Sequence, residues 1–167
     1  MAELILVRHT EAEKEETTDS ARKLTRKGHK QAKILSNILL PEINKFDLYV
    51  HSGIVRSEQT LNLILGDNHT FNTMQTSTLE HETKAIEFAK WLKIHADDLK
   101  KVMVVGHEPQ LSRFLSWAIA RSDQVKFRIK KGCLIRLHIS EFSELLTERM
   151  QLVELTSNKT LKSAHVL

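Results

Sequence analysis

The stretch Leu4-Ile5-Leu6-Val7-Arg8-His9 shows most directly how this chain folds. A short, continuous apolar run is typical of a strand that is buried on both faces of a parallel sheet. The apolar run ends abruptly at Arg8 and His9. We therefore expect these two side chains at the carboxyl end of a central strand.

Beyond this stretch, apolar runs alternate with segments of helical periodicity. Polar residues 10–23 predict a long surface loop, whose carboxylates, from Glu11 to Asp19, should be solvated or help select a basic partner surface. Thr25 is a suitable N-cap for the helix that follows this loop. The expected strands cover 4–7, 47–51, 102–105, 133–139 and 151–155, with a short one at 71–74, and the expected helices cover 25–41, the segment up to 65, 85–92 and 109–118.

This alternation predicts the fold class. Parallel strands joined through helices need right-handed crossovers, which place helices on both faces of the sheet. We expect an α/β protein, a three-layer α/β/α sandwich with a mostly parallel central sheet and an antiparallel strand at the edge. The 167 residues suffice for one core and are too few for two ordinary domains, so residues 1–167 should form a single domain.

Composition limits the possible settings of the protein. Hydrophobic residues make up 41% and charged residues 28% of the chain, which is the ordinary globular range. No apolar run approaches the roughly 20 residues of a membrane-spanning helix, and the start Met1-Ala2-Glu3 has no basic leader. A single cysteine, Cys133, suits a reducing compartment. We expect a cytoplasmic protein without membrane or nucleic-acid partners, because the net charge of +4 comes without a dense basic run.

Three predicted strands end in unusual polar residues. These are Arg8-His9, then His51-Ser52 with Arg56 one helical turn beyond, then Gly106-His107. Loops after the carboxyl ends of parallel strands gather at one edge of the sheet, where ligands bind. Two histidines and two arginines are therefore expected around one crevice.

This set of side chains favours phosphoryl chemistry. The planar guanidinium group matches the oxygens of a phosphoryl group, and a neutral imidazole can attack phosphorus. Either His9 or His107 could be the nucleophile, although a lone histidine at a strand end is usually structural. No His-x-x-x-His pair or carboxylate–histidine cluster has the spacing of metal ligands, so we expect no metal and no cofactor.

Four segments resemble the histidine phosphatase superfamily, which includes the cofactor-dependent phosphoglycerate mutases. They are residues 6–12 (LVRHTEA), 24–32 (LTRKGHKQA), 52–60 (SGIVRSEQT) and 104–109 (VVGHEP), in the same order as in that superfamily. The resemblance implies a phosphoglycerate mutase-like fold. The short chain looks most like the SixA-type phosphohistidine phosphatases, because only about one helix separates Leu65 from Val102. Relatives that act on small esters usually carry an extra segment there, and an open pocket would admit a protein-borne phosphohistidine.

The resemblance also implies residue roles. His9 resembles the nucleophile, Arg8 and Arg56 the phosphate clamp, and His107 the histidine that steadies the transferred group. Arg22 matches an arginine that reaches the phosphate in similar proteins, and it is otherwise a solvated side chain. Ser52 either donates to phosphate or caps the following helix.

The general acid is the least defined part of the expected site. Glu80 and Glu82 are the nearest candidates, but solvated surface carboxylates are the favoured interpretation of both. An imidazole leaving group needs little help from an acid, so the absence of a clear general acid favours a phosphohistidine substrate. We thus expect a metal-independent phosphatase that hydrolyses phosphohistidine on a phosphotransfer protein through a phosphorylated His9. The alternatives are a phosphomonoesterase for small phosphate esters and a non-catalytic phosphate-binding module.

Overall fold

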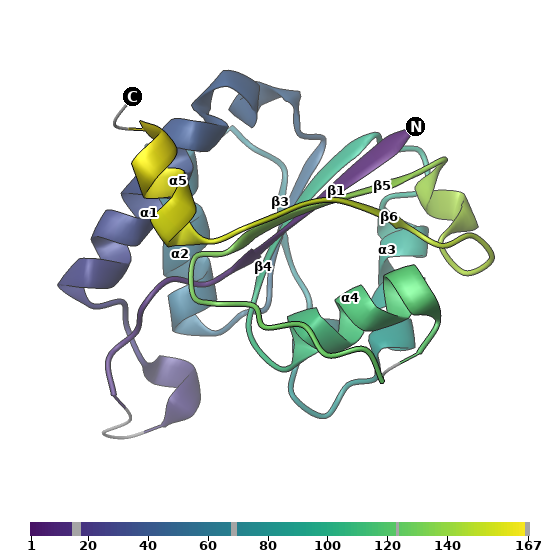
Figure 1. The fold of residues 1–167 in the computed structure, drawn as a ribbon, viewed down its shortest axis with the longest axis horizontal. Helices are drawn as coiled ribbons and strands as arrows, with labels where there is room; N and C mark the ends of the chain where they lie inside the picture. Colours follow the sequence, from purple (N-terminus) through teal and green to yellow (C-terminus); the bar gives the residue numbers. More distant parts are fainter. Residues whose placement is uncertain (15–17, 68–69, 123, 166–167) are drawn as a thin grey trace.

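The computed structural model describes residues 1–14, 18–67, 70–122 and 124–165. A central sheet carries helices on both faces (Figure 1). The strands are β1 (Ala2–Arg8), β2 (Leu48–His51), β3 (Thr73–Gln75), β4 (Lys101–Gly106), β5 (Leu134–Ile139) and β6 (Gln151–Thr156). The helices are α1 (Arg26–Leu39), α2 (Val55–Leu65), α3 (Ala85–His95), α4 (Gln110–Ala120) and α5 (Asn158–His165).

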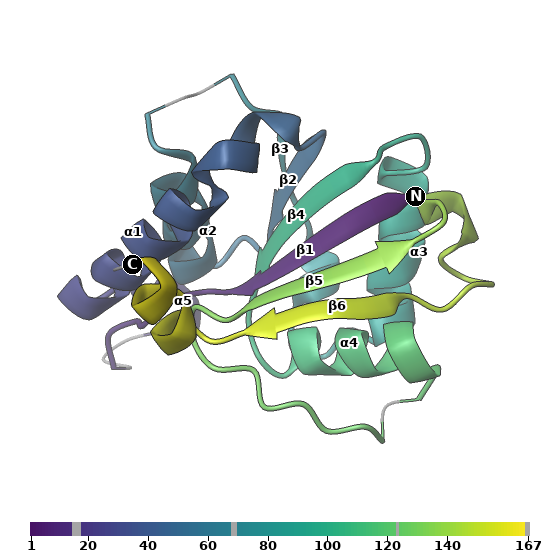
Figure 2. The ribbon, with the colours of Figure 1, turned by 45° about the horizontal axis from the view of Figure 1, so that its top comes forward.

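The six strands of the sheet lie in the order β3-β2-β4-β1-β5-β6 (Figure 2). The first four of these strands pair in parallel, β5 runs antiparallel to β1, and β6 runs antiparallel to β5. The predicted mostly parallel sheet with antiparallel pairing at one edge is confirmed, and the reversed strand is β5, one place in from that edge. Arg8 lies opposite Gly106 and His51 opposite Val105, so the carboxyl ends of β1, β2 and β4 are level.

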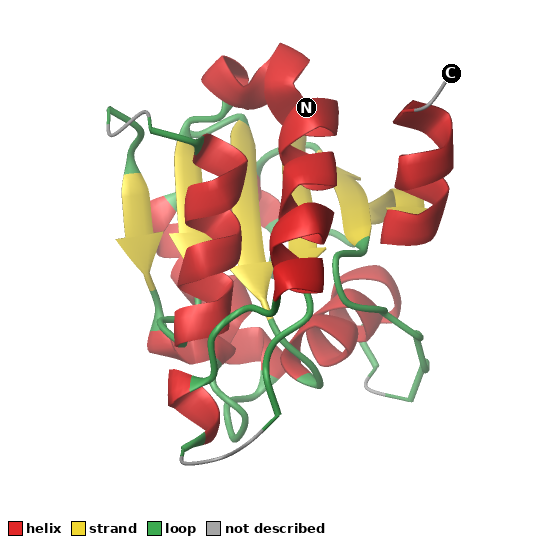
Figure 3. Cartoon of the chain, turned by 90° about the vertical axis from the view of Figure 1, so that its left-hand side faces the viewer, coloured by secondary structure: helices red, strands yellow, loops and turns green. Residues whose placement is uncertain are grey.

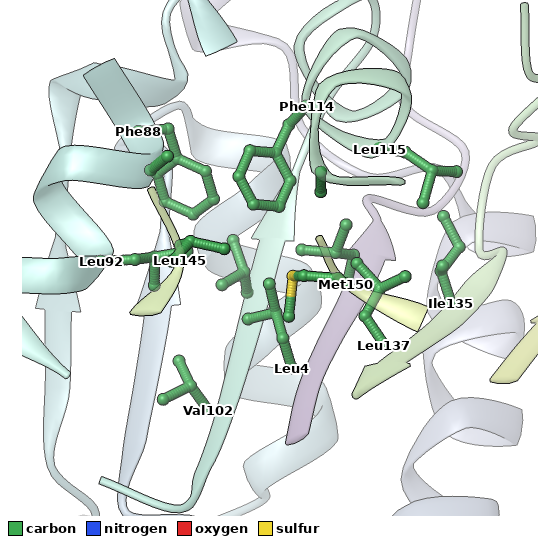
Figure 4. Close-up of a cluster of buried hydrophobic side chains, with 14 of the residues drawn as sticks. Leu4, Phe88, Leu92, Val102, Phe114, Leu115, Ile135, Leu137, Leu145 and Met150 are labelled. Atoms are coloured by element: carbon green, nitrogen blue, oxygen red, sulfur yellow. The ribbon is translucent and has the colours of Figure 1, made fainter. Parts of the chain in front are cut away.

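The sheet separates two hydrophobic clusters, which confirms the three layers. Helices α1, α2 and α5 cover one face, and α3 and α4 cover the other (Figures 1 and 3). Leu4 and Leu6 belong to the cluster that contains Phe114 of α4, and Figure 4 shows Leu4 on that side. Ile5 and Val7 belong to the cluster on the opposite face. The apolar run of β1 is continuous because both of its faces are buried.

The start of α1 holds the segment that follows β1 in place. The side chain of Thr25, the N-cap of α1, accepts a hydrogen bond from the backbone N of Gly28 at 3.0 Å. A Cβ atom at Gly28 would lie 2.0 Å from the carbonyl oxygen of Glu11. Only glycine permits this approach, which seats the chain just after His9 against the helix.

Some details differ from the expectations. The predicted strand at 71–74 lies at Thr73–Gln75, and Pro109 is the N-cap of α4 rather than part of its first turn. Helix α5 was not predicted, because Leu161 is its one residue in the hydrophobic clusters. Of the predicted loop at 10–23, residues 15–17 lie outside the described residues, and Asp19–Ala21 form a short 3-10 helix. No helix in the described ranges is long and apolar enough to cross a membrane.

Candidate active site

His9, Arg56 and His107 meet at the carboxyl edge of the sheet. His9 directly follows β1, Arg56 lies in the first turn of α2, and His107 directly follows β4. The backbone N of His9 donates to the carbonyl oxygen of Gly106 at 2.9 Å, which joins the ends of β1 and β4. The side chains of His9 and Arg56 touch, since Arg56 Nε lies 3.1 Å from His9 Nε2. The structure therefore brings together these segments as the topology predicts.

The hydrogen bonds of His9 define its tautomer. Its Nδ1 lies 2.7 Å from the carbonyl oxygen of Thr10, which can only accept, so Nδ1 carries the proton. Nε2 then holds a lone pair, and this lone pair accepts from Arg56 Nε. Burial lowers the pKa of His9 to about 3, the hydrogen bond to Thr10 opposes this shift, and the positive charges of Arg56 and Arg8 add to it. His9 is therefore a neutral imidazole at neutral pH.

His107 is fixed by two serines. Ser52 Oγ lies 3.2 Å from His107 Nδ1 and donates to Ser57 Oγ at 3.0 Å. Ser52 thus orients His107, and it does not cap α2, whose N-cap is Ile54. Burial lowers the pKa of His107 to about 4, and the charge of Arg56 contributes.

Asp19 is a site residue that the sequence analysis missed. Its carboxylate accepts from Arg56 Nη2 at 2.9 Å, and its backbone oxygen accepts from Arg56 Nη1 at 2.6 Å. The other carboxylate oxygen accepts from Arg22 Nε at 3.0 Å and Nη2 at 2.5 Å. Burial raises the pKa of Asp19, but the hydrogen bonds from Arg56 and Arg22 outweigh burial, so the pKa is lowered. Asp19 is 44% exposed at its side chain and is nevertheless paired with both arginines, and Arg22 reaches the site through it.

The cluster is closed to solvent. His9, Arg56 and His107 are 4%, 3% and 3% exposed. The segment that carries Asp19 lies against Arg56, and the open pocket stays a prediction. An oxyanion that binds to the same N–H of Arg56 Nη2 would compete with the Asp19 carboxylate.

Arg8 precedes His9 in the chain, and its positive charge acts on the His9 ring. Its Nη1 donates to the carbonyl oxygen of Ile129 at 2.7 Å, and its Nε is buried without a hydrogen-bond partner among the described residues. Burial lowers the pKa of Arg8. A partly buried guanidinium whose buried Nε has an unused donor favours a nearby anion.

The two candidate acids lie on the surface. Glu80 and Glu82 are exposed, and within the described ranges no hydrogen bond or ion pair holds either carboxylate. Between them, the ring of His81 lies 5.2 Å from the ring of His107, centroid to centroid. Arg113 Nη1 donates to the carbonyl oxygen of His81 at 3.1 Å, which ties this loop to α4. The sequence gives no signal for His81, because the ring contact depends on how the loop packs.

The described residues contain no group of three or more His, Cys, Asp or Glu side chains that could hold a metal ion. The arrangement presents the unprotonated Nε2 of His9 to the guanidinium of Arg56, and the positive charge of Arg8 also acts on His9. Such a site can bind and transfer a phosphoryl group through positioning and charge stabilisation.

Solved structures of phosphatases share this fold. The protein histidine phosphatase SixA, complexed with tungstate, has a TM-score of 0.80 and 16% identity over 95% of this chain and 99% of that chain. The alpha-ribazole phosphatase from Shigella flexneri has a TM-score of 0.76 and 18% identity over 93% of this chain and 96% of that chain. The phosphoserine phosphatase from Entamoeba histolytica, in complex with 3-phosphoglyceric acid, has a TM-score of 0.75 and 15% identity over 96% and 100%.

At these identities the likeness establishes the fold. No protein-family model matches the chain, and no curated protein sequence matches it. The chain therefore has the fold of these phosphatases, as its four sequence segments predict.

Proposed function

We propose that this protein is a member of the histidine phosphatase superfamily that hydrolyses phosphohistidine on proteins, with His9 as the nucleophile. One observation carries the proposal: Nδ1 of His9 donates to the Thr10 carbonyl, which leaves the Nε2 lone pair facing Arg56. Burial and the neighbouring arginines keep this nitrogen unprotonated. A neutral imidazole nitrogen directed at a guanidinium is suited to attack a phosphoryl group held there.

The reaction has two displacements. Nε2 of His9 attacks phosphorus, the bond to the substrate imidazole breaks, and that imidazole takes up a proton. Water then attacks the phosphorylated His9, the new bond between phosphorus and Nε2 breaks, and inorganic phosphate leaves. Arg56 and Arg8 stabilise the charge on the phosphoryl oxygens in both steps, and His107, held by Ser52, steadies the group.

The exposed positions of Glu80 and Glu82 support phosphohistidine as the substrate. An alkoxide leaving group needs a strong proton donor, whereas an imidazole leaving group needs much less help. Neither carboxylate is held in the site.

The single cysteine, Cys133, is buried and has no disulfide partner. This supports a location in a reducing compartment such as the cytoplasm.

A small phosphate ester is the second candidate substrate, and His81 favours it. An imidazole 5.2 Å from the ring of His107 is placed at the rim of the site, and histidine is a common proton donor near neutral pH. If His81 protonated a leaving oxygen, esters would become substrates.

The test compares three substrates without added metal: a phosphohistidine peptide, phosphoramidate and an alkyl phosphate. We expect rapid release of phosphate from the first two and slow release from the third. The variant His9→Ala should lose turnover, whereas the matched variant His29→Ala, at an exposed ring, should keep it. Mass spectrometry should find an acid-labile phosphoryl group on His9. Turnover that survives His9→Ala would refute the nucleophile, and equal rates on all three substrates would refute the substrate preference.

A further inference from the structure

A basic groove lies beside the candidate active site. It has a volume of about 420 Å³ and is bordered by the start of α1, the start of α5 and the segment before β5. Helix α5 packs beside α1 (Figure 1), so the two helix starts share this side of the molecule. The cations that line the groove are Arg8, Lys27, Arg128, Lys130, Lys131 and Lys159.

Backbone contacts hold the lysine-bearing segment against β1. The backbone N of Gly132 donates to the carbonyl oxygens of Arg8 and His9, at 3.0 and 3.2 Å. Gly132 has a φ of +68°, and a Cβ there would meet the side chain of Asn158 at 3.0 Å. Asn158 in turn donates to the carbonyl oxygen of Gln31 at 3.1 Å. Hydrogen bonds and close packing thus fix the segments that line the groove relative to one another.

The charge of the groove stands out from that of the rest of the chain. Its six cations face one carboxylate, Glu11, which pairs with Lys27 at 3.0 Å, so the lining carries +5. The whole chain carries +4, so the residues outside the groove sum to −1. The entire positive excess of the protein therefore lies along this groove, which should attract an extended acidic partner.

Arg8 connects the groove to the reacting atoms. Its guanidinium lines the groove and donates to Ile129, while its positive charge acts on His9. A ligand lying in the groove would therefore end beside the phosphoryl site. The lining contains no aromatic side chain on which a base could stack, so a single-stranded nucleic acid is less well matched than an acidic peptide.

We propose that this groove docks an acidic segment of the protein that carries the phosphohistidine. The inference rests on the proposed function, because it names the partner surface of the same site. The groove raises the local concentration of acidic substrates, and it leaves the chemical step to His9 and Arg56.

The test uses peptides of equal length with a central phosphohistidine, flanked by glutamates, by glutamines or by lysines. We expect kcat/KM to be roughly ten-fold higher for the glutamate peptide than for the glutamine peptide at low salt, and this preference should fade as salt rises. The double variant Lys130→Gln/Lys159→Gln removes two exposed cations of the groove. It should lose most of the preference through KM, and its turnover of phosphoramidate should equal that of the unmodified protein.

The matched control, Lys90→Gln/Lys93→Gln, removes two lysines of α3, on the opposite face of the sheet. It should keep the full preference for the acidic peptide. A wild-type protein without this preference, or a groove variant that retains it, would overturn the proposal. A groove variant that loses phosphoramidate turnover equally would also overturn it, because the effect would then be structural.

Binding separates failure of docking from failure of the proposed function. Fluorescently labelled peptides without phosphate should bind in the same order, and the groove variant should weaken only the acidic one. If no phosphohistidine substrate were turned over but this order held, the proposed function would fail and the docking surface would stand. Tighter binding of a single-stranded oligonucleotide than of the acidic peptide would overturn docking in favour of a nucleic-acid partner.

Discussion

Burial of a neutral His9 should make the stability of the protein depend on pH in a way that one substitution removes. The pKa of His9 falls from 6.5 to about 3 on folding. Between these values the unfolded chain binds a proton that the folded chain does not, so stability is lost as the pH falls below 6.5. At about 1.4 kcal/mol for each pH unit, lowering the pH from about 7.5 to about 5 costs about 2 kcal/mol at this one residue.

The variant His9→Gln should lack this loss. Glutamine keeps polar atoms near Thr10 and Arg56, and it does not titrate. Urea unfolding at the two pH values should therefore show that the wild type loses about 2 kcal/mol more than the variant. The control His29→Gln, at an exposed ring, should lose as much as the wild type. Equal losses in the wild type and His9→Gln would show that His9 is not buried in its neutral form, and the argument for its nucleophilic nitrogen would fail.

Three further variants test the site and its support. Arg56→Lys removes the planar guanidinium that reaches both His9 and Asp19, so kcat/KM for phosphoramidate should fall about 100-fold in steady-state assays. An unchanged kcat/KM would exclude Arg56 from the phosphate clamp. Asp19→Asn removes the negative charge that competes with an oxyanion for Arg56, so tungstate, as a phosphate analogue, should inhibit phosphoramidate turnover at about five-fold lower concentration. Weaker inhibition of the variant would mean that Asp19 helps to bind the oxyanion. Gly28→Ala would place a Cβ against the carbonyl oxygen of Glu11 and should lower the free energy of unfolding by about 3 kcal/mol in urea titrations. Gly66→Ala should lower it by about 1 kcal/mol, because a Cβ there meets open space and only the positive φ of +68° is unfavourable. Equal costs would show that the chain after His9 can shift freely.

The central fold could be predicted because its signals are strong and local. The runs at 4–7 and 102–105 are continuously apolar, since β1 and β4 are the middle strands and both faces of each are covered. The periphery gave weaker signals. Helix α5 contributes only Leu161 to the hydrophobic clusters, so its sequence resembles a polar loop.

The same distinction separates the predictable site residues from the missed ones. Arg8, His9 and His107 lie at the ends of buried strands, so the order of elements alone brings them to one edge. Asp19 lies in a short 3-10 helix and His81 in a loop, and the paths of both segments depend on contacts with distant residues. Their sequence context is that of solvated polar residues, and the ion pair with Arg56 or the ring contact with His107 becomes visible only in three dimensions.

The two arginines that share Asp19 contact different oxygen atoms of it, and this affects how a phosphoryl group can reach Arg56. Arg22 donates two hydrogen bonds to one carboxylate oxygen of Asp19, whereas Arg56 donates one to the other carboxylate oxygen and one to the Asp19 backbone oxygen. A phosphoryl group could therefore take Asp19's place on Arg56 while Asp19 remains anchored to Arg22. The incoming dianion would then lie between Arg56 and Arg8, so two guanidinium charges would balance two negative charges beside a neutral His9. On the proposed function, the contact between Asp19 and Arg56 thus keeps the guanidinium oriented and neutralised until an oxyanion replaces the carboxylate.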